Sequence, residues 1–155
     1  LIQSYTGQKP TVFRPCGGEY NDSVQASMQK LGMPIILWDV DTLDWKYRNA
    51  ASVKQHILDG AQDGAIVLEH DLYETTVEGV LAAIDELQQQ GYAFVTVSEL
   101  AKIKGVTLEA GKVYNGFTDE DLGLNTESEA TSESADSASD SSTANTQASD
   151  STSSN

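Results

Sequence analysis

The chain has 155 residues, a net charge of −15 and one cysteine. This length suits a single ordinary domain, and one cysteine excludes an internal disulfide. All nine Lys and Arg residues and 15 of the 24 acidic residues precede Thr118, so this part has a charge of −6 and no basic patch. We therefore expect no nucleic-acid partner, and no apolar run approaches the ~20 residues of a membrane span.

The composition changes sharply after Phe117. From Thr118 to the end the chain has no Lys, Arg or aromatic residue and consists mostly of Ser, Thr, Asp, Glu, Ala and Asn. Such a segment cannot bury enough apolar surface to offset the entropy lost on ordering. We therefore predict a domain over residues 1–105, its end or an extension over 106–117, and a disordered, acidic, Ser/Thr-rich tail over 118–155. Tails of this kind favour an extracellular or cell-wall-associated protein.

The first part of the chain predicts two strands with a helix between them. Residues 11–13 form a β-type run, and Asp22 is expected to cap a helix that ends at Gly32. Residues 35–38, Ile-Ile-Leu-Trp, are an apolar run typical of a strand buried on both faces. Within this run we expect Trp38 to pack in the core.

The alternation continues further along the chain. Ser52 is expected to cap a second helix, and residues 65–68 to form a second buried strand. The capping-box pattern Thr75-x-x-Glu78 predicts the start of a third helix. The core face of this helix is expected to contain Val77, Leu81 and Ile84.

Residues 93–97 predict a third buried strand, before a last helix that starts at Ser98. Strands and helices thus alternate, which indicates an α/β fold with a parallel sheet or barrel. In such folds functional sites lie at the carboxyl ends of the strands. Arg14, residues 39–45 and His70 each follow a predicted strand, so we expect these groups to meet at one place.

The polar groups at these strand ends are those of an incomplete hydrolase site. His70 offers a side chain that exchanges protons near neutral pH, and an aspartate of W-D-V-D-T-L-D-W, residues 38–45, would orient its ring. Arg14 would hold a carboxylate ionised. Gly17 and Gly18 leave backbone N–H groups accessible for an oxyanion. The pattern lacks a nucleophile.

Three motifs together resemble one enzyme family. F-R-P-C-G-G-E-Y-N (13–21), W-D-V-D-T-L-D-W (38–45) and I-V-L-E-H-D (66–71) have the order and spacing of the last three motifs of the polysaccharide deacetylases. These are the NodB-homology enzymes, carbohydrate esterase family 4. The segment at 91–100 also resembles the end of that domain. The resemblance covers about residues 5–105 and implies the C-terminal half of a distorted (β/α) barrel.

The resemblance also implies roles for individual residues. Arg14 would hold the catalytic-base aspartate, and the Gly17 N–H would help to bind the oxyanion of the tetrahedral intermediate. Asp44 would orient His70, which would protonate the leaving amine. The walls of the pocket for the acetyl methyl group would be formed by Trp45 and Leu68.

The same family depends on a divalent metal, usually zinc, that activates the attacking water. Its metal ligands and its base aspartate belong to the first two motifs, and neither motif occurs in this chain. We therefore expect no metal ligand here, a metal held by the missing N-terminal half of the domain, and no activity in the isolated chain. Cys16 departs from the family pattern, which has a second proline at this position.

The predicted function is part of a metal-dependent polysaccharide deacetylase. It would remove N-acetyl groups from a glycan that contains N-acetylglucosamine, with peptidoglycan first and chitin-type oligomers next. Three alternatives remain open. They are an acetylxylan O-deacetylase, a non-catalytic glycan-binding pseudo-deacetylase, and a hydrolase that uses the Cys16 thiol with His70 and Asp44.

Several of these residues also have plain structural interpretations. Without the other motifs, residues 14–18 would be interpreted as a turn. Asp39 and Asp41 are as well explained as hydrogen-bonded loop residues. Glu69 alternates with Leu68 and is expected to point away from the site.

Overall fold

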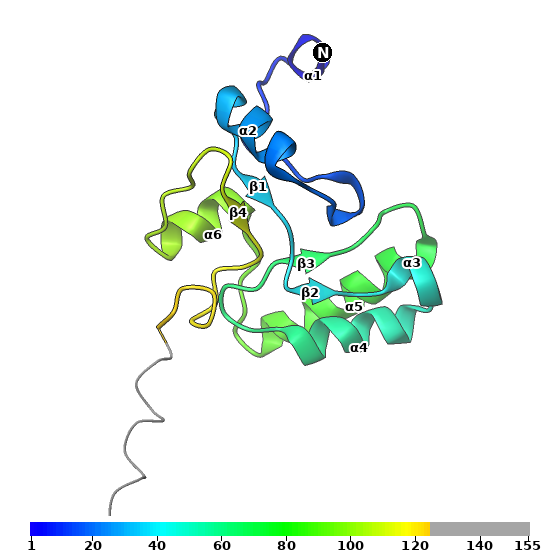
Figure 1. The fold of residues 1–155 in the computed structure, drawn as a ribbon. Helices are drawn as coiled ribbons and strands as arrows, with labels where there is room; N and C mark the ends of the chain where they lie inside the picture. The colour runs from blue at the N-terminus through cyan, green and yellow to red at the C-terminus, as the bar shows by residue number, and fades with distance from the viewer. Residues whose placement is uncertain (125–155) are drawn as a thin grey trace, which may run out of the picture. The chain divides into compact units, whose positions relative to one another are not determined.

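Helices and short strands are interspersed along the described chain, often with two elements of one kind in succession (Figure 1). The computed structural model describes residues 1–124. Its elements are α1 (Ile2–Thr6), the 3-10 turn η1 (Cys16–Gly18), α2 (Asp22–Leu31), β1 (Ile35–Ile36), β2 (Val40–Asp41), α3 (Asp44–Tyr47), α4 (Ala50–Gly60), β3 (Val67–Leu68), α5 (Glu74–Gln89), α6 (Val97–Ile103) and β4 (Val113–Tyr114). This mixture of helices and strands confirms the α/β class.

Two pairs of parallel strands organise these elements. β1 pairs with β4, with Ile35 opposite Val113, and β2 pairs with β3, with Val40 opposite Val67. Between β1 and β2 the chain changes partner at Trp38, so one extended segment joins both pairs. Because the pairing of β2 and β3 is parallel, their carboxyl ends lie on the same side. The predicted run at 11–13 forms a single parallel bridge with β1.

Two helices begin at asparagines rather than at the predicted caps. The Asn21 side chain accepts a hydrogen bond from the Val24 N–H, and the Asn49 side chain accepts one from the Ser52 N–H. The expectation that Asp22 and Ser52 are caps was therefore wrong. Both asparagines have the extended backbone of an N-cap, which leaves Asp22 and Ser52 inside the first turn.

The predicted capping box at 75–78 was also wrong. α5 begins directly after Tyr73, which has no side-chain cap and whose carbonyl accepts from the N–H of Thr76. A capping box does occur, but at the start of α6. There Thr96 and Glu99 satisfy each other's backbone N–H groups.

The strand predicted at 93–97 does not form. Val97 already belongs to α6, and Phe94 and Val95 are 49% and 43% exposed. An apolar run becomes a strand only when a neighbouring strand takes up its backbone hydrogen bonds. Within residues 1–124 no strand pairs with this segment.

The apolar core lies in two clusters. One cluster joins the strands to α6 and the C-terminal segment, and Trp38 packs against it as predicted. Its buried members are Ile36, Ile66, Ala101, Tyr114 and Phe117. The other cluster fills the contact between α4 and α5. Its buried members are Val53, Ile57, Ala83 and Leu87.

The predicted core face of α5 was only partly right. Val77 and Leu81 are 44% and 58% exposed, and Ile84 is half-buried. α5 instead turns a face with smaller residues, including Gly79 and Ala83, toward α4. The apolar residues of α5 therefore lie on two faces of the helix. One face packs against α4, and residues 1–124 leave the other face largely uncovered.

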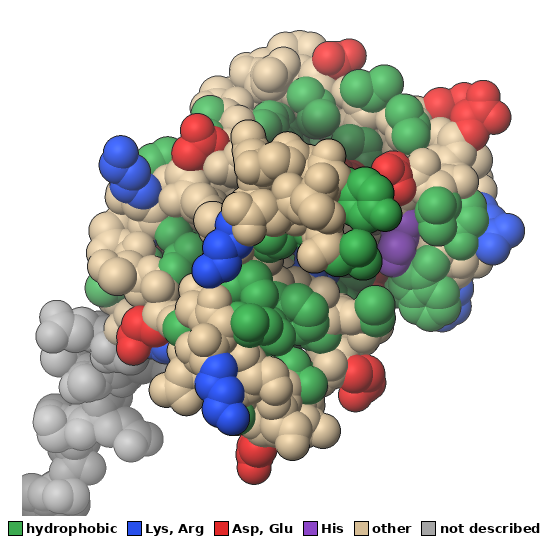
Figure 2. Space-filling model, turned by 90° about the horizontal axis from the view of Figure 1, so that it is seen from above, with side chains coloured by type: hydrophobic (Ala, Val, Ile, Leu, Met, Phe, Trp, Pro, Cys, Tyr) green, Lys and Arg blue, Asp and Glu red, His purple; other side chains and the backbone are tan. Residues whose placement is uncertain are grey.

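One face of the protein keeps much apolar surface, and Figure 2 shows hydrophobic side chains gathered over a broad area. A pocket of about 720 Å³ lies between α4, α5, β3 and the unpaired segment before α6. Its lining includes Ile57, Ile84, Leu87, Phe94 and Val95. None of the helices in residues 1–124 combines the length and apolar character of a membrane span.

The folded part continues past the predicted start of the tail. β4 lies in the segment predicted as a domain end or extension, and Phe117 is fully buried. Thr118 is also buried and forms a capped turn with Asp121. The rest of the predicted disordered tail, residues 125–155, lies outside the described residues.

Replacement of Gly64 by alanine is expected to destabilise the protein far more than Gly91→Ala. Both glycines have left-handed φ values, 105° and 94°. A Cβ at Gly64 would overlap the carbonyl group of buried Phe117, whereas a Cβ at Gly91 would meet nothing within 4 Å. Gly91→Ala should cost about 1–2 kcal/mol of backbone strain. In urea denaturation, Gly64→Ala should lose at least about 2 kcal/mol more, and equal losses would contradict this packing.

Candidate active site

The loop after β2 aims one aspartate at the end of β3. Thr42 is fully buried, and its hydroxyl donates to the Leu68 carbonyl over 2.9 Å. The Asp41 carboxylate accepts from the Leu43 N–H over 2.9 Å. Leu43 has a left-handed φ of 51°, a conformation that non-glycine residues rarely adopt. These contacts turn the chain sharply, so that Asp44 begins α3 beside the residues that follow β3.

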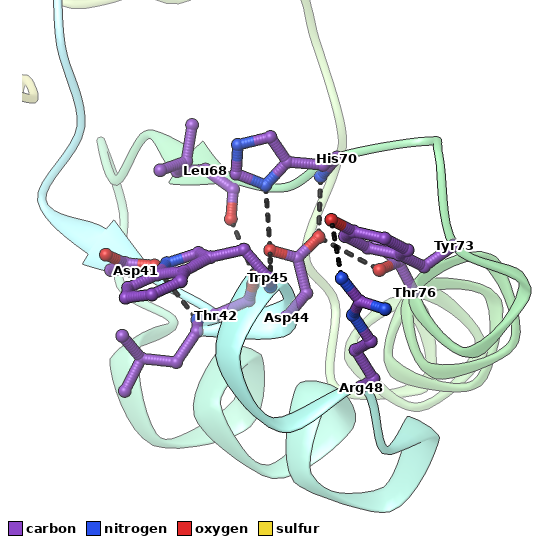
Figure 3. A network of polar contacts seen from close by, with 10 residues as sticks. Asp41, Thr42, Asp44, Trp45, Arg48, Leu68, His70, Tyr73 and Thr76 are labelled. Carbon is purple, nitrogen blue, oxygen red and sulfur yellow. Dashed lines mark hydrogen bonds and ion pairs between the residues drawn. The ribbon is translucent and has the colours of Figure 1, made fainter. Parts of the chain in front are cut away.

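Asp44 and His70 form a hydrogen-bonded dyad (Figure 3). Asp44 is fully buried, and its Oδ1 accepts from Nδ1 of His70 over 2.8 Å and from the Trp45 N–H over 2.8 Å. Its Oδ2 accepts from the His70 N–H over 2.7 Å and from the Thr76 hydroxyl over 2.9 Å. Each carboxylate oxygen therefore has two donors, and the predicted meeting of Asp44 with His70 is found.

These donors decide the charge of the dyad. Burial raises the pKa of Asp44, but hydrogen bonds from the His70 side chain, the His70 N–H, the Thr76 hydroxyl and the Trp45 N–H outweigh it and lower the pKa overall. An ionised carboxylate only accepts hydrogen bonds, so Nδ1 of His70 carries the proton in this pair. The His70 side chain is 38% exposed, and Nε2 is the ring nitrogen left to exchange a proton with a ligand.

The turn at residues 14–18 presents a backbone donor. Gly17 has a left-handed φ of 63°, and its N–H has no backbone acceptor within residues 1–124. A Cβ at Gly18 would stand 2.8 Å from the Trp38 ring, which requires glycine at this position. Cys16 is exposed in the same turn, and its thiol makes no hydrogen bond to His70 among the described residues.

Arg14 is exposed, and its charge acts on Glu69. Burial raises the pKa of Glu69 and the Asp44 charge raises it further, whereas the Arg14 guanidinium lowers it. Arg14 and Glu69 also line the same pocket. Glu69 is therefore electrically part of this region, although the sequence pattern directed it away from the site. The alternation of side chains along a strand gives no information about charged groups on other elements.

The two predicted pocket residues lie next to the dyad. Leu68 is buried at the end of β3, and Trp45 is half exposed in the first turn of α3. Beyond them, the Arg48 guanidinium lies 4.4 Å from the centre of the Tyr73 ring. Sequence reasoning missed Thr76, because a threonine in the first turn of a helix is usually explained by capping.

The other aspartates of the motif have structural roles. The Asp39 carboxylate accepts from the Ile66 N–H over 2.7 Å, and Asp41 holds Leu43. Among residues 1–124 no three His, Cys, Asp or Glu side chains lie together as metal ligands.

Comparison with curated proteins relates the chain to peptidoglycan deacetylases. No family model matches it. It is 47% identical over 114 residues to the peptidoglycan-N-acetylglucosamine deacetylase PgdA of Listeria monocytogenes. This match covers 74% of this chain and 23% of the relative. It is 38% identical over 104 residues to the peptidoglycan-N-acetylmuramic acid deacetylase PdaC of Bacillus subtilis, which covers 67% of this chain and 22% of the relative. The chain thus spans less than a quarter of the length of these relatives.

Comparison with solved structures also relates the chain to a deacetylase and to family 4 proteins. T48 deacetylase, solved with substrate, has a TM-score of 0.67 and 33% identity over 74% of this chain and 55% of that chain. A family 4 acetyl xylan esterase from Clostridium thermocellum, solved with a cobalt ion, has a TM-score of 0.67 and 29% identity over 74% and 57%. A family pseudoenzyme from Bacillus anthracis has a TM-score of 0.61 and 30% identity over 75% and 38%.

Asp44 is expected to stabilise the fold at neutral pH and to lose this effect in acid. Folding lowers the pKa of Asp44. Just below pH ~4, this carboxyl group is therefore protonated in the unfolded chain but still ionised in the folded protein. The stabilisation is therefore complete above pH ~4 and disappears as the pH falls through the folded pKa. By chemical denaturation at pH 7, Asp44→Asn should lose about 2–3 kcal/mol, and this loss should shrink in acid.

Asp39→Asn serves as a control of opposite sign. Burial raises the pKa of Asp39 despite the hydrogen bond from the Ile66 N–H. On acidification, the stability of wild type should therefore rise relative to that of Asp39→Asn, because protonation removes a partly desolvated negative charge. A pH-independent cost of Asp44→Asn would show that folding does not lower the pKa of Asp44.

Proposed function

Because this chain corresponds to a part of the polysaccharide deacetylase domain of carbohydrate esterase family 4, we propose that it supplies the general-acid half of a deacetylase active site. The substrate would be a glycan with N-acetylated glucosamine, peptidoglycan first and chitin-type oligomers next. The observation that carries this proposal is the bond from Nδ1 of partly exposed His70 to the buried Asp44 carboxylate.

The reaction needs a proton at one defined moment. When the tetrahedral intermediate breaks its C–N bond, the glycan nitrogen must gain a proton to leave as an amine, while the acetyl carbon leaves as acetate. Nε2 of His70 would donate this proton, and Asp44 would stabilise the protonated ring. The Gly17 N–H, which has no backbone acceptor among the described residues, would bind the developing oxyanion. Trp45 and Leu68 would enclose the acetyl methyl group.

The remaining machinery would come from another segment of the same domain. We assign to it a divalent metal, zinc by resemblance, with its ligands and the base aspartate that Arg14 would hold. Two observations support a further segment: the apolar pocket and the unpaired extended residues before α6. In this proposal, the described residues are the C-terminal half of a distorted (β/α) barrel, and the isolated chain is inactive.

The nature of the substrate also bears on location. Peptidoglycan lies outside the cytoplasmic membrane, so an enzyme that acts on it would be extracellular or attached to the cell wall. The names of the relatives PgdA and PdaC support this location. An O-deacetylase of acetylated xylan is the alternative within the same chemistry, and the match to an acetyl xylan esterase favours it.

A second candidate is a non-catalytic glycan-binding protein. The match to a solved structure described as a family pseudoenzyme favours it, because that protein has a similar fold. In that case the protein that carries this chain would bind the glycan in a pull-down assay and release no acetate from it. Acetate release from purified peptidoglycan would exclude this candidate.

His70→Ala in the protein that carries this chain should lower turnover by about 10²–10⁴-fold, because the leaving amine then lacks its proton donor. Bound metal should remain, since His70 acts as an acid in this proposal. His56→Ala is the matched control, because His56 bonds to the Ser52 carbonyl on α4 and lies outside the dyad. Acetate release measures turnover. Unchanged turnover in His70→Ala, or acetate release by the isolated 155-residue chain, would overturn the proposal.

Cys16→Ser separates this chemistry from a thiol hydrolase. A serine keeps the size of the side chain but is a far weaker nucleophile than a thiolate. Because Cys16 is exposed and its thiol makes no hydrogen bond to His70 among the described residues, we expect acetate release to stay within about twofold of wild type. A loss of more than about 100-fold would favour the thiol mechanism.

A further inference from the structure

Thr76 is a buried polar residue with no assigned role. It is 2% exposed in the first turn of α5, and its hydroxyl donates to Oδ2 of Asp44 over 2.9 Å. The other three donors to this carboxylate are N–H groups of Trp45 and His70. Thr76 is therefore the contact by which a separate helix holds the aspartate of the dyad (Figure 3).

This contact acts on the rotation of the carboxylate. The terminal torsion of an aspartate is broad, so the direction of its two oxygens depends on their hydrogen bonds. Thr76 and the His70 N–H hold Oδ2, which leaves Oδ1 directed at Nδ1 of the His70 ring. Without the hydroxyl, Oδ2 would keep one donor, and a buried carboxylate oxygen would be short of a partner.

The position of the hydroxyl is fixed by packing away from the site. Thr76 shares a face of α5 with Gly79, Ala83 and Leu87, which are all buried. A Cβ at Gly79 would stand 2.7 Å from Val53 of α4, so the two helices are in close contact. The first turn of α5 is also the positive end of its helix dipole, which favours a carboxylate beside it.

We propose that Thr76 is a positioning residue for the general acid: its hydroxyl keeps the Asp44 carboxylate turned toward Nδ1 of His70, so that Nε2 is the proton-donating atom. The positioning rests on the contacts of the dyad. Its effect on turnover rests on the proposed deacetylase function, so the two are measured separately.

The test compares Thr76→Val with Thr76→Ser in the protein that carries this chain. Valine removes the hydroxyl at nearly constant volume, whereas serine retains it. Ring ¹⁵N–¹H NMR of labelled histidine reports the Nδ1–H of His70. We expect this signal to be lost or shifted in Thr76→Val and retained in Thr76→Ser. His56 is an internal control, because its Nδ1 lies 2.7 Å from the Ser52 carbonyl, away from Thr76.

The kinetic part uses acetate release. Thr76→Val should lower kcat about 10-fold with KM within about twofold, and serine should restore kcat. Thr75→Val is the control on the same helix turn, because Thr75 is not one of the four donors to Asp44. Should valine unfold the protein, Thr76→Ala and Thr76→Ser give the same comparison, because they differ only by the hydroxyl.

The outcomes separate the two claims. An unchanged His70 Nδ1–H signal in Thr76→Val, or its loss in Thr76→Ser as well, would overturn the positioning role. If the NMR result is as expected but wild type releases no acetate, the positioning role stands and the proposed deacetylase function fails. A changed signal with unchanged kcat in an active protein would show that Thr76 does not position the acid for catalysis.

Discussion

The buried carboxylate of Asp44 is the constraint on which the rest of the site depends. An ionised carboxylate away from water costs several kcal/mol unless its oxygens are filled by donors. Here both oxygens are filled, and the donors come from the start of α3, from His70 shortly after β3 and from the first turn of α5. Three structural segments, of which the first is more than 20 residues from the other two in sequence, are therefore held at one point by one charge.

The local backbone follows from this requirement. To bring Asp44 under the end of β3, Leu43 adopts a left-handed conformation, and Thr42 is anchored to the Leu68 carbonyl. Strain of this kind persists only where surrounding contacts determine the conformation. The parallel register of β2 and β3, with Asp41 opposite Leu68, also fixes where the loops that lead to Asp44 and His70 begin. His70 then needs no strained geometry of its own to reach the carboxylate.

The resemblance to the polysaccharide deacetylases singles out Asp44 as the partner of His70. The sequence pattern itself predicts only that an aspartate of residues 38–45 meets His70, because both follow strands and strand ends converge in any parallel α/β arrangement. It does not predict the contacts that depend on backbone angles. Asn21 and Asn49 are caps because their backbones are extended, and Asp22 and Ser52 are equally plausible caps in the sequence. Thr76 was missed for a related reason, since nothing in a linear pattern distinguishes a hydroxyl that caps a helix from one that reaches another loop.

The errors in the core have a different cause. The apolar residues at 93–97, and Val77 and Leu81 of α5, have the pattern of buried elements but remain exposed or unpaired. An apolar side chain is buried only when a second surface covers it. The apolar pattern of one segment predicts that such a surface exists but does not identify it. In the proposed domain, this partner is the segment with the metal ligands and the base.

The two halves of the proposed site therefore differ in how they are assembled. The contacts that orient His70 all lie among residues 41–76, and the α4–α5 cluster supports them from below. None of the four hydrogen bonds to the Asp44 carboxylate comes from a residue that lines the apolar pocket. Closure of that pocket by another segment would therefore add the base and the metal without rearranging the acid.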